Sequence, residues 1–432
     1  MSIIKIIQAQ FFQKGIARAL KHRNFRIFVL TNWFNTFGNW FQRVGIGWLA
    51  WQLTHSEFWL GAVAFAEAVP LLVFIIFAGA IIDRVNSIFL LRSLQILVII
   101  QGILIATLTT FDLINIISLT ILAMCNGMIQ TFHLPIRLTI VPRLVPLNDL
   151  TPSVGLNSAL FNIARFVSPA IAGFIIAKYS VEVIFWLSII GFVIFAIGLA
   201  IINPINDARH QTRTTGLYSD VINGLSYLTK HASIGPLLLY VFIGASFSRS
   251  FMDLAPSFAD VVFKQGVEGL GLILSAIGIG GVAGATGLAN YGRTKGLVKV
   301  CLSSLAITAV LLIVFTSSQN FVLALICCLG LGITLAISTN APQILIQNTV
   351  DEDMRGRVMS IYSLTYRAGP AIGALIIGAI SSYVNLQLAV ASGAIICLIC
   401  VLIMFPKRTK LAAEMESTRT TPMQPTTNNK VM

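Results

Sequence analysis

Long apolar stretches follow one another along nearly the whole chain, and short polar segments separate them. Each stretch is about 20 residues long, the length that an α-helix needs to cross a hydrocarbon core of roughly 30 Å. The pattern predicts an all-α integral membrane protein with twelve transmembrane helices, over residues 26–51, 58–82, 89–110, 115–134, 151–177, 183–203, 234–262, 269–291, 297–316, 320–341, 358–382 and 387–405.

The composition fits a membrane environment and leaves little chain for a soluble domain. Hydrophobic residues make up 56% of the 432 positions and charged residues only 10%, against roughly 25% charged residues in ordinary soluble domains. All six cysteines fall inside predicted spans, so no disulfide is expected. No grouping of residues typical of an enzyme's active site stands out, and no enzymatic activity, cofactor or metal site is expected.

The net charge of +13 reflects the position of the basic residues in alternate loops. Outside the spans, Lys and Arg lie almost entirely on the side of the two termini, and the opposite face keeps only Lys178 and Lys264. By the positive-inside rule this distribution places both termini in the cytoplasm. The charge therefore indicates topology, and no nucleic-acid partner is expected.

The chain contains two halves built on one template. Pro169 begins the run Pro-Ala-Ile-Ala-Gly-Phe-Ile-Ile, and 201 residues later Pro370 begins Pro-Ala-Ile-Gly-Ala-Leu-Ile-Ile. Six spans therefore repeat as six spans. The expected organisation is a cytoplasmic amphipathic N-terminus at 1–24, a six-helix bundle at 25–203, a central cytoplasmic linker at 204–233, a second six-helix bundle at 234–406 and a disordered cytoplasmic tail at 407–432.

Short motifs along most of the chain carry a family resemblance. They include Trp40-Phe41-Gln42-Arg43-Val44, Gly79-Ala80-Ile81-Ile82-Asp83-Arg84, the stretch from Asn157 to Arg165, and Arg355-Gly356-Arg357-Val358-Met359-Ser360. The sequence resembles the branch of the major facilitator superfamily that holds the bacterial enterobactin exporter and macrolide-type drug exporters. The resemblance implies two six-helix bundles that rock about a central site, with a siderophore or an amphipathic drug-like compound as cargo.

Two groups of residues resemble conformational motifs of that superfamily. Gly79, Asp83 and Arg84 match its loop motif, although Asn86 and Ser87 replace the usual glycine and first basic residue. The second group, Gly155, Pro169 and Gly173, resembles an antiporter signature. At the 201-residue offset, Gly356 and Pro370 correspond to Gly155 and Pro169, and Gly373 corresponds to Ala172. Small residues allow close helix packing and the proline kinks the helix, so this span is expected to act as a bending gate or simply to pack tightly.

Polar residues at helical spacing mark two spans that correspond in the two halves. Asn32, Asn35, Asn39 and Gln42 share one face of the first span, next to Arg43, and this face is expected to line a water-filled cavity. The corresponding span of the second half carries Ser246, Arg249, Asp253, Ser257 and Asp260. Two facing polar stripes predict a central translocation path.

Ionisable side chains at membrane depth are costly and suggest function. The candidates are Arg43, Glu67, Arg165, Arg249, Asp253 and Arg367. A carboxylate removed from water favours its protonated form, which suits Glu67 or Asp253 as a proton carrier. Arg43 and Arg165 are expected to attract an anionic substrate or to balance Glu67. Arg249 and Asp253, four residues apart, alternatively neutralise each other as a structural pair.

The expected function is proton-driven export of a small organic molecule across the bacterial cytoplasmic (inner) membrane, by a monomer whose other partners are protons and membrane lipid. Four arginines against two carboxylates in the spans favour a cargo that bears carboxylates. A lysophospholipid flippase of the same architecture and a membrane sensor that binds ligand without moving it remain alternatives. Metal-ion export is disfavoured, because the spans lack a His, Cys and carboxylate cluster.

Overall fold

The computed structural model describes residues 15–202, 226, 231 and 233–416, without the side chains of 15–17, 75–84, 134, 135, 138, 139, 147, 352 and 353. This part of the chain is helical throughout. Eleven of its segments are long and apolar enough to cross a membrane. The first long helix, α2 (Arg23–Thr54), is not among them, since its 32 residues include the polar stripe and several arginines.

The first half contains six long helices. After α2 come α3 (Glu57–Arg84), α4 (Ser87–Thr110), α5 (Ile116–Leu144), α6 (Leu150–Lys178) and α7 (Val181–Ile201). Turn residues fix several of their beginnings: Asn86 and Asn115 cap α4 and α5 by accepting hydrogen bonds from backbone N–H groups of the first turn. α5 extends ten residues beyond the predicted span, so Arg137 and Arg143 belong to a helix and not to a loop.

The second half begins with a broken helix and continues with five long ones. The predicted span at 234–262 is divided into α9 (Ile234–Ile243), a π-helix (Gly244–Ser248), a 3₁₀ turn (Ser250–Met252), α10 (Ala255–Ser257) and a second π-helix (Phe258–Val262). We call residues 234–262 the broken segment. Then follow α11 (Gly266–Tyr291), α12 (Leu297–Ser317), α13 (Phe321–Thr349), α14 (Glu352–Ser381) and α15 (Leu386–Met404).

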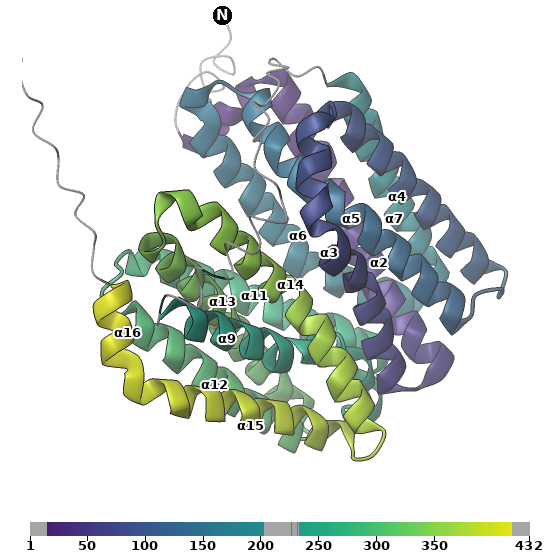
Figure 1. Ribbon diagram of the computed structural model, residues 1–432. Helices are drawn as coiled ribbons and strands as arrows, with labels where there is room; N and C mark the ends of the chain where they lie inside the picture. The colour runs from purple at the N-terminus through teal and green to yellow at the C-terminus, as the bar shows by residue number, and fades with distance from the viewer. Residues whose placement is uncertain (1–14, 203–225, 227–230, 232, 417–432) are drawn as a thin grey trace, which may run out of the picture.

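The two halves form two groups of helices that meet along two pairs. Figure 1 shows α2 to α7 in one group and α9 and α11 to α16 in the other. Across the boundary α3 packs against α14 and α6 packs against α11. α6 and α14 carry the repeated prolines Pro169 and Pro370 inside the helix. The structure therefore matches the repeat in the sequence. In each half, the helix that contains the repeated proline packs against a helix of the other half.

Glycines allow the two inter-half pairs to approach closely. A Cβ atom placed on Gly61 of α3 would overlap the carbonyl oxygen of Ala374, and one placed on Gly378 of α14 would overlap that of Glu57. In the other pair, a Cβ on Gly173 would lie 2.9 Å from the Cα atom of Gly271. Backbone contact of this kind is typical of helix packing in membranes, where small residues line the interface.

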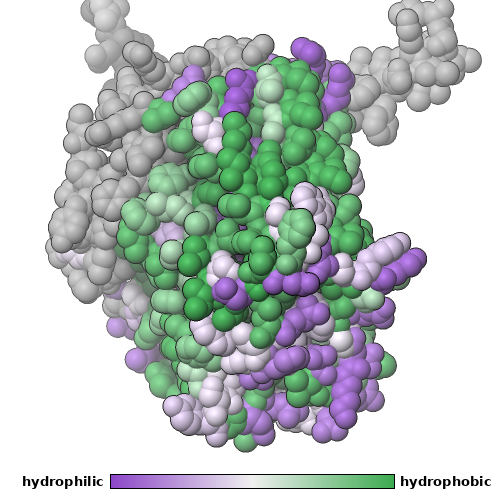
Figure 2. Space-filling view, turned by 90° about the vertical axis from the view of Figure 1, so that its right-hand side faces the viewer, coloured by the Kyte–Doolittle hydropathy of each residue, from purple (hydrophilic) through white to green (hydrophobic). Residues whose placement is uncertain are grey.

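The outer surface is apolar, as a lipid-facing surface must be. Large hydrophobic side chains that are more than half exposed include Phe89, Phe174, Ile326 and Leu402. In the space-filling view, apolar residues cover most of the described face and hydrophilic residues gather toward its lower edge (Figure 2). Soluble monomers rarely expose apolar patches of this extent. The chain is a multi-pass membrane protein.

The two terminal segments differ from the sequence predictions. Of the predicted amphipathic helix at 1–24, residues 1–14 lie outside the described residues, and Gly15–Lys21 form a 3₁₀ helix packed on α2 and α6. The prediction of a disordered tail over 407–432 is wrong for α16 (Arg408–Met415), and residues 417–432 lie outside the described residues. Leu411 and Met415 are buried against α12 and α13, since they add apolar surface at helical spacing. The predicted linker at 204–233 falls largely outside the described residues.

Candidate functional site: a charged cavity between the halves

A cavity of about 330 Å³ lies between the two halves. Its walls come from α2, α3, α5 and α6 of the first half and from the broken segment, α11 and α14 of the second. Apolar side chains line two of these walls, Leu60 and Val63 on α3 and Leu270 and Leu274 on α11. A small organic molecule that is partly apolar and partly charged fits such a lining.

All six ionisable residues that the sequence singled out line this cavity. They are Arg43, Glu67, Arg165, Arg249, Asp253 and Arg367. They come from five separate elements, and the fold brings them together although they are up to 324 residues apart in the sequence. Four arginines against two carboxylates give the cavity an excess of positive charge.

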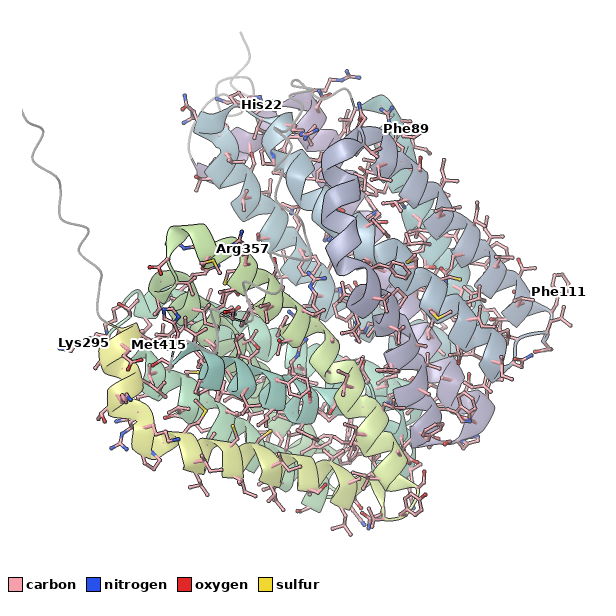
Figure 3. The ribbon with its side chains drawn as sticks, in the orientation of Figure 1. His22, Phe89, Phe111, Lys295, Arg357 and Met415 are labelled. Carbon is pink, nitrogen blue, oxygen red and sulfur yellow. The ribbon has the colours of Figure 1, made fainter. Side chains whose placement is uncertain are left out.

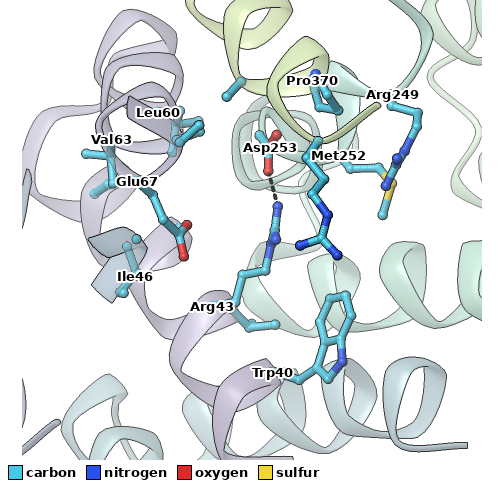
Figure 4. A pocket seen from close by; sticks show the side chains of 18 of the residues that line it. Trp40, Arg43, Ile46, Leu60, Val63, Glu67, Arg249, Met252, Asp253 and Pro370 are labelled. Carbon is cyan, nitrogen blue, oxygen red and sulfur yellow. Dashed lines mark hydrogen bonds and ion pairs between the residues drawn. The ribbon is translucent and has the colours of Figure 1, made fainter. Parts of the chain in front are cut away.

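The carboxylate of Asp253 is paired with an arginine of the other half. Arg43 Nη2 of α2 donates a hydrogen bond to Asp253 Oδ1 at 2.9 Å, and Figure 4 shows the two side chains reaching toward each other across the cavity. The alternative that Asp253 pairs with Arg249 is therefore wrong. Asp253 closes a 3₁₀ turn in the broken segment, so the i, i+4 spacing of a regular helix does not hold there.

Glu67 lies beside the Arg43–Asp253 pair, to its left in Figure 4. Its Oε1 accepts a hydrogen bond from Asn126 Nδ2 of α5 at 3.0 Å, and its charge interacts with those of Arg43 and Asp253. The close approach of α3 and α5 at this point depends on Gly127, where a Cβ atom would overlap the backbone of Glu67. The charge of Arg43 thus interacts with two carboxylates, one in each half.

Arg249 packs on an aromatic ring and not on an acid. Its guanidinium carbon lies 4.3 Å from the ring centroid of Tyr366, which stacks parallel to Tyr362. A cation over an aromatic face is stabilised without being neutralised. Tyr366 lines the cavity and was missed by the sequence analysis, although it directly precedes Arg367.

The amide stripe of α2 does not line the cavity as expected. Asn32, Asn35 and Gln42 are buried within the first half. Their partners come from α4, α5 and α6: Asn32 with Asn157 and Arg137, Asn35 with Gln95, Asn39 with Gln130, and Gln42 with Gln101. Buried amides are costly unless hydrogen-bonded, and each of these four bonds at least one side chain of a neighbouring helix. The stripe therefore fixes the packing of the first half.

His133 belongs to the same network. Its Nε2 atom lies 3.0 Å from Gln95 Oε1 and the ring is buried. Within the part of the chain that the structure describes, no three His, Cys, Asp or Glu side chains come together as a metal site.

The second polar stripe is also divided by its local structure. Arg249 and Asp253 reach the cavity, while Ser246 and Ser257 are buried. Ser257 Oγ donates to Glu57 Oε1 at 2.7 Å, and Asp260 Oδ2 accepts a bond from Trp51 Nε1 at 2.9 Å. Both bonds join the two halves near the loop between α2 and α3, together with the contacts of Gly61 and Gly378.

These bonds lie at one end of the molecule. We call it the far side, which also carries Phe111, and we call the opposite end, with His22, Lys295, Arg357 and Met415, the terminus side (Figure 3). The two groups of helices diverge toward the terminus side (Figure 1). The structure thus ties the halves together on the far side of the cavity.

The residues of the conformational motifs are placed differently from one another. Gly79, Asp83 and Arg84 belong to the end of α3, where side chains are not described. Pro169 is buried and Gly173 packs on α11, while Pro370 lines the cavity and Gly373 packs on the backbone of Ser246. Gly155 and Gly356 have nothing within 4 Å of an added Cβ. The close packing expected from small residues therefore applies to Gly173 and Gly373 but not to Gly155 and Gly356.

Comparison with solved structures agrees with this architecture. The nucleoside transporter NupG matches with a TM-score of 0.72 at 13% sequence identity, covering 89% of this chain and 98% of its own. A bacterial homologue of the iron transporter ferroportin, in an inward-facing state, matches with a TM-score of 0.69 at 16% identity, covering 90% and 99%. This likeness shows that the chain has the same fold as these two proteins.

Sequence comparison identifies the family. The model of the transmembrane secretion effector family matches residues 16–431. The chain belongs to this family of major facilitator transporters. It is 27% identical to the staphyloferrin A transporter of Staphylococcus aureus over 328 residues. The matched region covers 75% of this chain and 81% of the relative. It is 24% identical over 368 residues to the multidrug efflux pump Tap of Mycolicibacterium fortuitum, covering 81% and 87%.

A third relative is macrolide efflux protein A of Streptococcus pyogenes, with 25% identity over 299 residues, or 65% of this chain and 70% of the relative. The resemblance to the exporter branch of the superfamily is thereby confirmed. Its members are transporters and not enzymes.

Proposed function

We propose that the protein is a proton-coupled exporter of a small organic molecule that carries carboxylates. The observation that carries the proposal is the cavity itself, where side chains of both halves place four arginines and two carboxylates around one space. The relatives named above, one for a siderophore and two for drugs, support export of a small organic compound. Of these two cargo types, the excess of arginine favours the siderophore type over an amphipathic drug.

The proposed architecture has twelve spans in two six-helix bundles, 25–203 and 234–406, with α2 as the first span and the broken segment as the seventh. The terminus side faces the cytoplasm of a bacterium and the far side faces outward, as the distribution of Lys and Arg indicates. The protein works as a monomer in the cytoplasmic membrane. Two parallel repeats with a site at their interface suit alternating access.

Glu67 and Asp253 are the proposed proton carriers, and Arg43 connects them. Export driven by the inward proton gradient requires the proton and the cargo to move in opposite directions. After the cargo has left on the outer side, protonation of Asp253 removes its charge, and the empty transporter returns with the proton. Deprotonation in the cytoplasm restores the bond to Arg43 and completes the cycle. Glu67, held by Asn126 in the first half, competes for the same arginine.

The test compares the compounds that a deletion strain and the same strain complemented with the parent gene release into iron-poor medium. Complementation is repeated with Glu67→Gln and Asp253→Asn, and with Glu182→Gln, an acid of the first turn of α7, as the matched control. The proposal predicts that one iron-chelating, carboxylate-bearing compound is lost on deletion and restored by the parent and the control, but not by at least one cavity variant. An unchanged medium contradicts the siderophore assignment.

A further inference from the structure

Three arginines cluster at the terminus-side part of the cavity. Arg165 lies one helical turn before Pro169 in α6, and Arg367 lies one turn before Ala371 in α14. Both helices begin on the terminus side, so both side chains lie between the middle of the cavity and that end. Arg249 extends from the broken segment onto Tyr366, which neighbours Arg367 in sequence.

No described carboxylate neutralises this cluster. Asp253 is bonded to Arg43 and Glu67 to Asn126, while Arg165, Arg249 and Arg367 have no ion pair among the residues that the structure describes. Tyr366 interacts electrostatically with all three of them. The cavity thus contains three guanidinium groups around one phenol, in surroundings where water screens charge less than in bulk.

The cluster also spans the boundary between the halves. Arg165 belongs to the first half, whereas Arg249 and Arg367 belong to the second, and the charges of Arg165 and Arg249 interact. A fourth arginine extends the pattern toward the terminus side: Arg137 of α5, about 10 Å along the helix from the cavity residue Gln130, interacts with Arg367 across the boundary. Like charges in the two halves oppose the approach of the halves on this side.

An oxyanion is the ligand that matches the cluster chemically. Guanidinium groups bind carboxylates, sulfates and phosphates through two parallel hydrogen bonds, and Arg is preferred where such recognition is needed. An anion bound between arginines of the two halves attracts the arginines on both sides. This attraction replaces the repulsion between the two halves. The remainder of the ligand then meets the apolar wall at Leu270 and Leu274.

We propose that Arg165, Arg249 and Arg367 form a binding site for an oxyanion of the cargo, and that an anion bound there allows the terminus side to close. The inference rests on the proposed function, because it assigns the cargo's anionic group to one part of the transport cavity. Without a bound anion, repulsion among these arginines holds the terminus side open. The transporter is thereby kept from closing its terminus side without cargo.

Closure is measured as a distance and does not require transport. Gly155 and Gly356 sit at corresponding places near the terminus-side ends of α6 and α14, both with open space around them. Gly155→Cys and Gly356→Cys, in a variant whose six native cysteines are replaced, carry spin labels whose distance reports the terminus side. A second pair, Phe111→Cys and Tyr383→Cys, uses side chains that are 68% and 91% exposed and reports the far side.

The probes are sodium succinate and sodium sulfate, compared with neutral succinamide and with sodium chloride at equal ionic strength. We expect either oxyanion to raise the population with a short terminus-side distance about fivefold, at the low end of typical couplings between a ligand and a conformational change. The far-side distance lengthens in parallel. Succinamide and chloride leave both distances unchanged.

Variants separate a bound anion from a general salt effect. Arg165→Gln and Arg367→Gln are expected to abolish the response to oxyanions and to raise the closed population in their absence. Arg143→Gln, which removes the same charge from the last turn of α5, keeps the response of the parent. If neither oxyanion shifts the distances in the parent, or if Arg165→Gln responds as the parent does, the inference is wrong.

The outcome is independent of the proposed proton coupling. Distances that respond to oxyanions, in a protein whose efflux ignores the proton gradient, would contradict the proposed coupling and leave the anion site intact. Proton-driven efflux with distances that ignore both oxyanions would contradict only the anion site.

Discussion

Arg43 of α2 and Asp253 of the broken segment form an ion pair across the cavity, with Nη2 and Oδ1 2.9 Å apart. The pair joins the two halves, and both partners line the space where cargo is proposed to bind. We expect this bond to break when the far side opens or when a cargo anion takes its place. It therefore contributes to the balance between the two states of the transporter.

Removal of the pair shifts this balance toward the far-side-open state. The Arg43 side chain is 55% exposed to the cavity, so the pair stabilises the closed far side by about 0.5–1 kcal/mol, as exposed pairs do. Arg43→Gln is expected to raise the far-side-open population about two- to fivefold, measured with the spin-label pair at 111 and 383. The exchanged variant Arg43→Asp with Asp253→Arg restores the parent distances if the pair is the cause, and leaves them open if it is not.

Glycines on the far side are expected to influence the equilibrium between far-side-closed and far-side-open states, because they allow α3 and α14 to pack closely. Gly61→Val places a side chain against Ala374 and Gly378→Val places one against Glu57, so each pushes α3 and α14 apart. Overpacking typically costs 1–3 kcal/mol, and we expect lower thermal stability and a longer far-side distance. Gly155→Ala is the matched control, because its Cβ meets nothing within 4 Å. A loss of stability in the control equal to that of Gly61→Val would contradict the explanation.

The N-terminal 3₁₀ helix is attached to the first half through Asp149. Hydrogen bonding by His22, together with the charge of Arg18, holds the pKa of the Asp149 carboxyl below its ordinary value of 3.8. A lowered pKa means that the attachment is fully present above pH 3.8 and is lost as the pH falls through the folded-state pKa.

Asp149→Asn is therefore expected to release residues 15–22 at neutral pH, seen as faster backbone hydrogen exchange in that segment. In the parent the same release appears only in acid, below pH 3.8. Equal exchange rates in parent and variant at pH 7 would show that packing, and not this carboxylate, holds the segment.

The end of α16 caps another helix of the second half. The carboxylate of Glu416 accepts hydrogen bonds from the backbone N–H groups of Gly296, at 2.6 Å, and Val298, at 2.8 Å, at the start of α12. Caps of this kind typically stabilise by about 0.5–2 kcal/mol. Glu416→Ala should lower the unfolding temperature of the purified protein, whereas Glu268→Ala, at the exposed start of α11, should change it much less. The opposite order would contradict the cap.

Hydrophobic periodicity predicted the helices well, because the bilayer imposes length and polarity on every span. It also singled out the six ionisable residues that line the cavity, since charges inside apolar runs are conspicuous. Their partners were not predictable. Arg43 and Asp253 are 210 residues apart, and only the packing of the two halves decides that they meet.

The amide stripe shows why a helical face alone does not identify a cavity. Asn32, Asn35 and Gln42 share a face, but Gln95 and Gln101 on α4 form hydrogen bonds with two of them inside the bundle. A second stripe went unnoticed: Asn126, Gln130, His133 and Arg137 follow one another at spacings of four, three and four on α5. This spacing is the sequence signal that could have predicted the hydrogen-bond network of the first half and the place of Arg137 in it.

The broken segment could not be read as one face because it is not one helix. Two π-helices and a 3₁₀ turn rotate successive side chains away from a constant 3.6-residue period. Pro256, which lacks a backbone N–H, stands where the α-helical turn α10 begins and is the local sequence feature that marks the interruption.

Proton-driven flux tests the central claim most directly. The purified protein is placed in vesicles with a pH gradient, and accumulation of the carboxylate compound collected from the parent strain's medium is measured with and without a proton uncoupler. The account predicts accumulation against the concentration gradient that the uncoupler abolishes and that Glu67→Gln or Asp253→Asn impairs. Accumulation that persists unchanged in the uncoupler would contradict proton coupling.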